Sequence, residues 1–140
     1  MKKSIFGTLL QLESVFLILT ASVSFLYNEK DWWVFMLCAT LSFVIGAITI
    51  SIGKWKARHN NEDQGKYFSR ADSFLVVTLT WVLFSIIGMI PYIALENMSV
   101  TDAMFEAMSG FTTTGASVIS DVDGLSNGLK FWRCITQWMG

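Results

Sequence analysis

The stretch EAMSGFTTTGASV, residues 106–118, carries the residue types in this chain that are best suited to chemistry. Three consecutive threonines and Gly115 follow Gly110, and no charged residue follows Glu106 within the stretch. Backbone carbonyls can replace the hydration shell of a monovalent cation, and threonine hydroxyls can hold such carbonyls in place. Gly115 can take a positive φ angle or let an ion approach the backbone closely. The pattern predicts a segment that offers its backbone to a cation.

Other kinds of site find little support in the sequence. His59 is the only histidine and the carboxylates are scattered, so neither a nucleophile with its base nor a metal cluster is predicted. Cys38 lies in an apolar run far from Cys134, which is typical of a small buried thiol. The net charge is −1, with no basic run of the kind that follows nucleic acid. We expect neither an enzyme, nor a bound cofactor, nor a nucleic-acid partner.

The composition indicates a membrane protein. Hydrophobic residues make up 53% of the 140 residues and charged residues only 15%, where a soluble domain has about 25% charge. Three runs, Ile5–Tyr27, Trp32–Ile52 and Ser73–Leu95, each exceed the roughly 20 residues that cross a bilayer. The first run is longer than the apolar part of a cleavable signal, so a retained helix is expected. Residues 28–31 predict a tight turn between the first two helices.

Basic residues set the expected orientation. Lys2 and Lys3 precede the first run, and five of the basic residues lie in the loop 54–70 after the second. The positive-inside rule places both regions, and thus the N-terminus, in the cytoplasm. The turn at 28–31 and the chain just after Leu95 are then expected outside.

A short helix is predicted directly before the threonines. Ser99 can be its N-cap, Asp102 falls at its third position, and Gly110 is its expected end. About ten helical residues span only about 15 Å, half a bilayer, and the extended residues that follow can cover roughly 16–20 Å on the way back out. This pattern favours a re-entrant pore loop, although TTTGAS taken alone also fits an ordinary external loop. Residues 121–128 then form an exposed loop, and residues 129–140 begin a membrane helix that is too short to span.

Three motifs, in order, carry a resemblance to a known family. They are TWVLFSIIGMIPY at 80–92, DAMFEAMSGFTTTGASV at 102–118 and FWRCITQWMG at 131–140. The region from 69 to 140 resembles the Trk/Ktr/HKT superfamily of potassium transporters, and within it the membrane subunit of bacterial Trk systems. Residues 1–68 fit only by having two helices. The resemblance implies an all-α membrane fold: a hairpin and cytoplasmic loop over 1–68, then a first helix–pore-loop–helix unit of potassium-channel-like fold over 69–140, truncated in its last helix.

The same resemblance implies the site and its function. Members of the family contain four such units with pseudo-fourfold symmetry, each giving one selectivity-filter strand to a ring of carbonyls around K+. Position by position, the strand here is 112–116, and the carbonyls expected to bind K+ are first those of Thr113 and Thr114, then those of Gly115 and Thr112. Met104, Met108 and Ser117 depart from the residues common in the family, without touching the carbonyls.

One strand cannot complete a ring, so either this is the N-terminal piece of a longer transporter or four chains assemble; the ending QWMG favours the piece. The partners implied are membrane lipid, K+, three further pore units, a second copy of the full protein and a cytoplasmic nucleotide-binding regulatory subunit, which the basic loop 54–70 could dock. The location implied is the bacterial inner membrane, in K+ uptake. The competing hypothesis is a non-conducting helical scaffold or assembly protein whose polar external loop only closes a hairpin.

Three further residues have structural and functional interpretations. Glu13, two turns into the first helix, fits a carboxylate near the inner headgroups that faces other helices, or a partner- or ion-sensing site. Arg133 is expected to pair with Glu106 or Asp121. Pro91 is expected to end the third helix.

Overall fold

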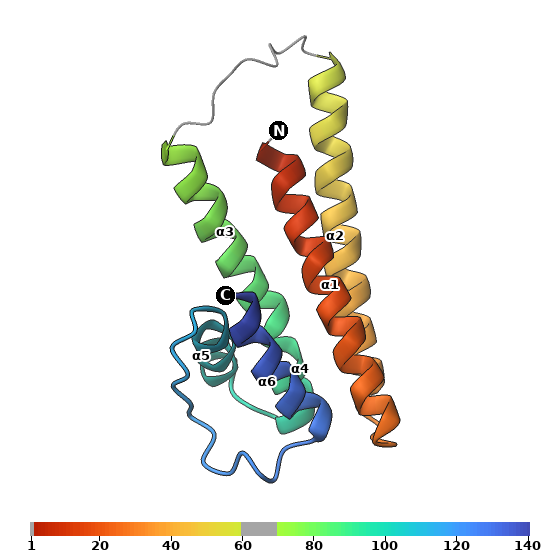
Figure 1. The fold of residues 1–140 in the computed structure, drawn as a ribbon, viewed down its shortest axis with the longest axis vertical. Coiled ribbons are helices and arrows are strands. Elements are labelled where there is room, and N and C mark those ends of the chain that lie inside the picture. Colours follow the sequence, from red (N-terminus) through yellow and green to blue (C-terminus); the bar gives the residue numbers. More distant parts are fainter. Residues whose placement is uncertain (1, 60–69) are drawn as a thin grey trace.

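The computed structural model describes residues 2–59 and 70–140, and these form helices joined by turns and irregular segments (Figure 1). The helices, in chain order, are α1 Lys2–Leu26, α2 Trp32–His59, α3 Arg70–Gly88, α4 Ile90–Glu96, α5 Val100–Phe111 and α6 Asn127–Met139. Within these described residues, three segments are long and apolar enough to cross a membrane: Ile5–Leu26, Trp32–Trp55 and Phe74–Glu96. The predicted all-α membrane fold is thereby confirmed. Most of the basic loop 54–70 lies outside the described residues.

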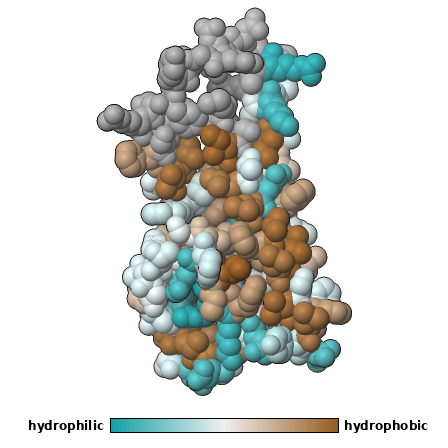
Figure 2. Space-filling model, viewed as in Figure 1, coloured by the Kyte–Doolittle hydropathy of each residue, from teal (hydrophilic) through white to brown (hydrophobic). Residues whose placement is uncertain are grey.

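The outer faces of the long helices are apolar. Large exposed side chains include Leu12 and Val15 on α1, Ile48 on α2, and Phe74 and Leu75 on α3. In Figure 2 the hydrophobic side chains gather over the long helices, and hydrophilic side chains gather toward the lower end. A continuous helical backbone with such a surface meets lipid without unsatisfied backbone groups. The chain is a multi-pass membrane protein.

Helices α1 and α2 form a closely packed antiparallel hairpin (Figure 1). Their backbones touch at two glycines, since a Cβ added to Gly7 would lie 2.6 Å from the Gly46 carbonyl oxygen. The turn at 28–31 is short, as predicted, and Asn28 takes a φ of 55° there. Asparagine tolerates this left-handed conformation better than most residues.

The third span is broken instead of being one helix that ends at Pro91. Helix α3 ends at Gly88 and α4 begins at Ile90, with Pro91 in its first turn. Proline has no N–H and so cannot donate to the carbonyl four residues earlier, but its fixed φ suits the start of a helix. The step is bridged by the Met89 N–H, which donates to the Ser85 carbonyl at 2.9 Å. Proline therefore starts a short helix where we had expected it to stop a long one.

Helix α5 packs against α3 and α4, and α6 packs against α5 and α1 (Figure 1). The ring centroids of Phe84 and Phe111 are 5.4 Å apart, and those of Phe111 and Trp132 are 6.2 Å apart in an edge-to-face arrangement. The end of α6 lies beside α5, whereas the start of α6 lies near the end that carries the α1–α2 turn (Figure 1). The chain from 112 to 126 runs from the end of α5 to the end of the molecule that carries the α1–α2 turn.

The start of α6 is tied to the N-terminal hairpin. Ser126 is its N-cap, and its hydroxyl accepts from the Leu129 N–H at 3.3 Å. The Glu29 carboxylate, from the α1–α2 turn, accepts from the Asn127 N–H at 2.7 Å, the Asn127 side-chain amide at 2.9 Å and the Gly128 N–H at 3.0 Å. A carboxylate is favoured at this positive end of a helix. The hairpin thus holds one end of the helix that follows the candidate site.

Candidate functional site

Helix α5 begins as its sequence predicts. Ser99 is the N-cap, and its hydroxyl oxygen accepts from the Asp102 N–H at 3.2 Å while the hydroxyl donates to the Asp102 carboxylate at 2.8 Å. The 12 residues of α5 make a helix of about 18 Å. Its buried side includes Ala103, Ala107 and Phe111. The helix is therefore about half as long as a membrane span.

The end of α5 shows where the threonines lie. The Thr112 and Thr113 N–H groups still donate to the helix, to the carbonyls of Met108 at 2.8 Å and Gly110 at 3.0 Å. We had expected extended chain from Thr112, but Thr112 and Thr113 form a turn, and irregular chain begins at Thr114. The reason is that the last carbonyls of a helix lack intrahelical donors, and these two N–H groups satisfy those of Met108 and Gly110.

Two residues at this turn have positive φ angles, Thr113 at 57° and Gly115 at 73°. For glycine the left-handed conformation is free of strain, which agrees with the role predicted for Gly115. For a β-branched residue such as Thr113 it is an outlier, and such strain gathers at functional sites. The backbone is thus bent sharply at the positions where the ion-binding carbonyls are predicted.

The threonine hydroxyls are occupied by local bonds. Thr112 Oγ1 donates to the Met108 carbonyl at 2.8 Å and lies 2.9 Å from Thr114 Oγ1, and Thr113 Oγ1 donates to the Thr112 carbonyl at 2.7 Å. The Thr112 carbonyl therefore already has one donor. Within residues 2–59 and 70–140, no hydrogen bond reaches the carbonyls of Thr113, Thr114 or Gly115, all three of which are exposed. Their assignment to K+ stays a prediction.

Ser109 connects α5 to the returning chain. Its carbonyl accepts from the Thr114 N–H at 3.0 Å and the Gly115 N–H at 3.4 Å. Its hydroxyl donates to the Ala116 carbonyl at 2.6 Å. One serine therefore binds three consecutive residues of the returning strand.

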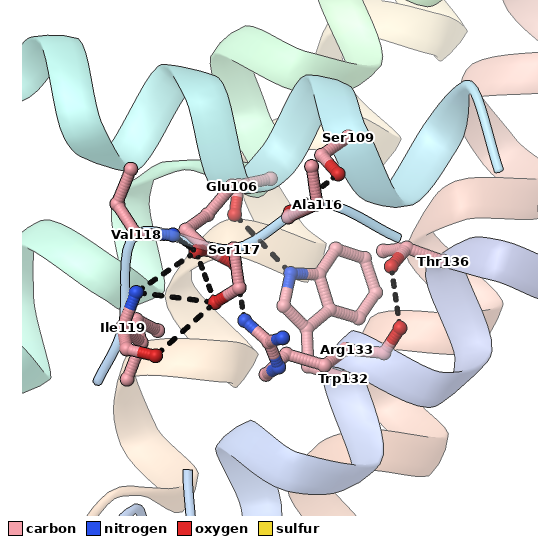
Figure 3. A network of polar contacts seen from close by, with 10 residues as sticks. Glu106, Ser109, Ala116, Ser117, Val118, Ile119, Trp132, Arg133 and Thr136 are labelled. Atoms are coloured by element: carbon pink, nitrogen blue, oxygen red, sulfur yellow. Dashed lines mark hydrogen bonds and ion pairs between the residues drawn. The ribbon is translucent and has the colours of Figure 1, made fainter. Parts of the chain in front are cut away.

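Glu106 binds the next part of that chain (Figure 3). Its Oε1 accepts from the Ser117 hydroxyl at 2.6 Å, the Val118 N–H at 2.6 Å and the Ile119 N–H at 3.3 Å. Its other carboxylate oxygen forms an ion pair with Arg133 of α6. The sequence offered Glu106 and Asp121 as partners of Arg133, and the pairing with Glu106 is confirmed.

Helices α5 and α6 approach closely behind the returning chain. A Cβ added to Gly110 would lie 2.4 Å from Thr136 Oγ1, so the contact requires glycine. A cavity of about 10 Å³ lies beside this contact, with Gly115 and Gln137 among its lining residues. That volume is close to the smallest space that holds one water. The surroundings of the strand are polar and tightly packed.

Some of these residues were missed by sequence reasoning. Ser109 was not singled out, and Glu106 was considered only as a partner of Arg133. Both bind residues that follow the turn, and only the path of the turn brings them together. Glu29 was also missed, because its partners at the start of α6 lie almost a hundred positions away.

Comparison with known proteins now adds to this geometry. The sequence model of the TrkH family, described as a cation transport protein, matches residues 39–140. This chain belongs to the TrkH family of cation transport proteins. The family consists of transporters and not of enzymes, which agrees with the sequence prediction.

Curated relatives and a solved structure extend the match. The chain is 35% identical over 138 residues to the Trk system potassium uptake protein TrkH of Salmonella typhimurium, covering 97% of this chain and 27% of the relative. It is 33% identical over 136 residues to the Trk system potassium uptake protein TrkG of Escherichia coli, covering 96% and 26%. The crystal structure of the potassium transporter TrkH from Vibrio parahaemolyticus matches with a TM-score of 0.80 and 34% identity, over 98% of this chain and 29% of that one.

The matched region is wider than the sequence motifs indicated, but it is only part of each relative. The likeness includes the N-terminal hairpin, so residues 1–68 resemble the family by more than their two helices. The chain also spans only about a quarter of the length of these relatives.

Proposed function

We propose that this chain supplies one selectivity-filter strand to a K+ uptake transporter of the bacterial inner membrane. The observation that carries the proposal is that Thr113, Thr114 and Gly115 are exposed residues and that no donor within the described residues occupies their carbonyls. Carbonyls of this kind can replace the hydration shell of K+. Membership of a cation transport family and the names of the relatives support the same ion.

The electrostatics of α5 agree with a cation. The C-terminal end of a helix carries about half a negative charge, and α5 ends directly before Thr112. Thr112 is the fourth proposed K+ residue, because a carbonyl oxygen has a second lone pair beside the one that Thr113 Oγ1 uses. No bound cofactor is needed for this chemistry.

The proposal includes an architecture. Residues 1–68 form the hairpin and its cytoplasmic loop, and residues 69–140 belong to the first of four pore units in a longer chain. The N-terminus is cytoplasmic, and α5 enters from the outside with its C-terminal end toward the bilayer midplane. The full protein forms a homodimer and binds a cytoplasmic nucleotide-binding regulatory subunit, for which the basic loop 54–70 is a candidate surface.

Cysteine accessibility tests the proposal against a non-conducting scaffold. In the full-length transporter, with Cys38 and Cys134 replaced, Thr113→Cys and Asp123→Cys would be treated from outside with a large charged thiol reagent. Asp123 lies in an exposed loop and serves as the control. We expect Asp123→Cys to be labelled quickly and Thr113→Cys to be protected, because the filter strand lies inside the ring. Equal labelling rates would contradict the pore-loop assignment and favour the scaffold.

A further inference from the structure

We infer that Glu106, held by Arg133, is a positioning residue that fixes the filter strand and so determines how well the pore separates K+ from Na+. The inference rests on the proposed function. In this role the buried carboxylate does not bind K+ itself. It positions the carbonyls that are proposed to bind K+.

The geometry gives Glu106 a particular place. It lies on α5, which enters the site, and its Oε1 binds the hydroxyl of Ser117 and the N–H groups of Val118 and Ile119, which leave the site. The proposed filter residues lie between these two attachment points. Helix α5 fixes one end of the strand and Glu106 fixes the other. The distance between these two attachment points, which residues 112–116 must span, is therefore fixed.

Burial makes this attachment specific. Glu106 is only 3% exposed, and a buried carboxylate is stable only when it is hydrogen-bonded and paired with a positive charge. Arg133 supplies that charge from α6, with its own side chain 18% exposed. Ser117 alone could be replaced by another donor, but the ion pair determines where the carboxylate sits.

Helices α5 and α6 are also held together by contacts that do not involve Glu106. Helices α5 and α6 also meet at Gly110 with Thr136 and at Phe111 with Trp132, and none of these contacts uses Glu106. Ser109 independently holds Thr114, Gly115 and Ala116. A change that weakens Glu106 should therefore loosen the outer part of the strand while the helices stay packed.

The test uses Glu106→Gln in the full-length transporter. The amide keeps an acceptor for Ser117 and Val118 but loses the charge that holds Arg133. We expect the ratio of K+ to Na+ uptake to fall by about tenfold, at wild-type abundance in the membrane. Glu106→Asp, which keeps the charge on a shorter side chain, should restore part of the ratio. Asp121→Asn, the control at the other carboxylate considered for Arg133, should leave the ratio unchanged.

Thiol labelling and a second variant, Ser117→Ala, test the same role independently. Protection of Thr113→Cys from the external reagent should decrease in Glu106→Gln, because the strand is less constrained. An unchanged uptake ratio together with unchanged protection would overturn the inference while leaving the pore loop intact. If Glu106→Gln does not accumulate, Ser117→Ala removes one donor without touching the charge. It should lower the ratio by about threefold, and an unchanged ratio would again contradict the inference.

Discussion

Among the side chains that the structure describes, two carboxylates are buried, Glu13 and Glu106, and their partners differ. Glu13 of α1 is 0% exposed; one oxygen accepts from the Ser42 hydroxyl at 2.8 Å, and the other has no partner within the described residues. Glu106 of α5 is 3% exposed, and its oxygens bind three hydrogen-bond donors and Arg133. Glu13 thus has a single hydrogen-bond partner within the described residues, whereas Glu106 connects α5, the chain at 117–119 and Arg133 of α6.

The difference follows from the backbone around each carboxylate. Helices α1 and α2 satisfy their own backbone groups, so the hairpin needs only close apolar packing, as at Gly7 and Gly46. The chain after α5 is not helical, and its N–H groups need partners from side chains. We therefore expect polar residues to contribute more around the proposed filter strand than in the hairpin. Three substitutions, from the largest expected effect to the smallest, test this contrast.

Glu106→Leu should have the largest effect. It leaves Arg133 and the Val118 N–H without their acceptor, while the Ile119 N–H keeps the Ser117 hydroxyl oxygen at 3.1 Å. Breaking a buried ion pair costs about 3–5 kcal/mol. We expect a clear fall in the melting temperature of the purified full-length protein in detergent, together with loss of uptake. A melting temperature equal to that of the wild type would mean that the polar network contributes little.

Glu29→Ala should have an intermediate effect, because Glu29 joins the two regions. It removes the acceptor of three hydrogen bonds at the start of α6, while Ser126 still caps the helix. At an exposed helix end this should cost about 1 kcal/mol. Thermal unfolding would be compared with that of Lys30→Ala, which changes the neighbouring exposed residue. Equal melting temperatures for the two variants would contradict a link between hairpin and pore unit.

Glu13→Leu should have the smallest effect. Replacing this carboxylate by an apolar side chain removes a buried oxygen that has no hydrogen-bond partner within the described residues, so the change should be close to neutral. We expect an unchanged or raised melting temperature and unchanged K+ uptake. A large loss of uptake with the melting temperature preserved would instead give Glu13 the sensing role that the sequence left open.

Much of the fold could be predicted from the sequence because its signals are local. Long uncharged runs determine the spans, and Ser99 with Asp102 determines the start of α5. Gly115 was selected for its conformational freedom, and it has a positive φ. Glu13 was placed correctly among other helices, although its fully buried position against Ser42 was not predicted.

The rest depends on contacts between residues distant in the sequence. Pro91 marks a helix boundary, but its letter alone does not say whether a helix ends or begins there. The partners of Glu106 are fixed by the path of the turn at Thr113, whose left-handed conformation is unusual for threonine. The partners of Glu29 depend on the packing of α6 against the hairpin. No periodic pattern in the sequence predicts the contacts of Glu106 and Glu29 or the type of helix boundary at Pro91.

The central claim is that the backbone at Gly115 lines the path of K+. Growth on limiting K+ and the ratio of K+ to Na+ uptake in the full-length transporter carrying Gly115→Asp test it most directly. A Cβ at this position would meet no atom closer than Gln137 Nε2 at 3.7 Å, so crowding within this unit does not cause a loss. The φ of 73° strains most side chains, but aspartate tolerates this left-handed conformation better than most residues. Ser120→Asp, in the exposed chain nearby, adds the same charge as a control. We predict that Gly115→Asp loses growth or selectivity while Ser120→Asp keeps both; unchanged growth and selectivity in Gly115→Asp would contradict the claim.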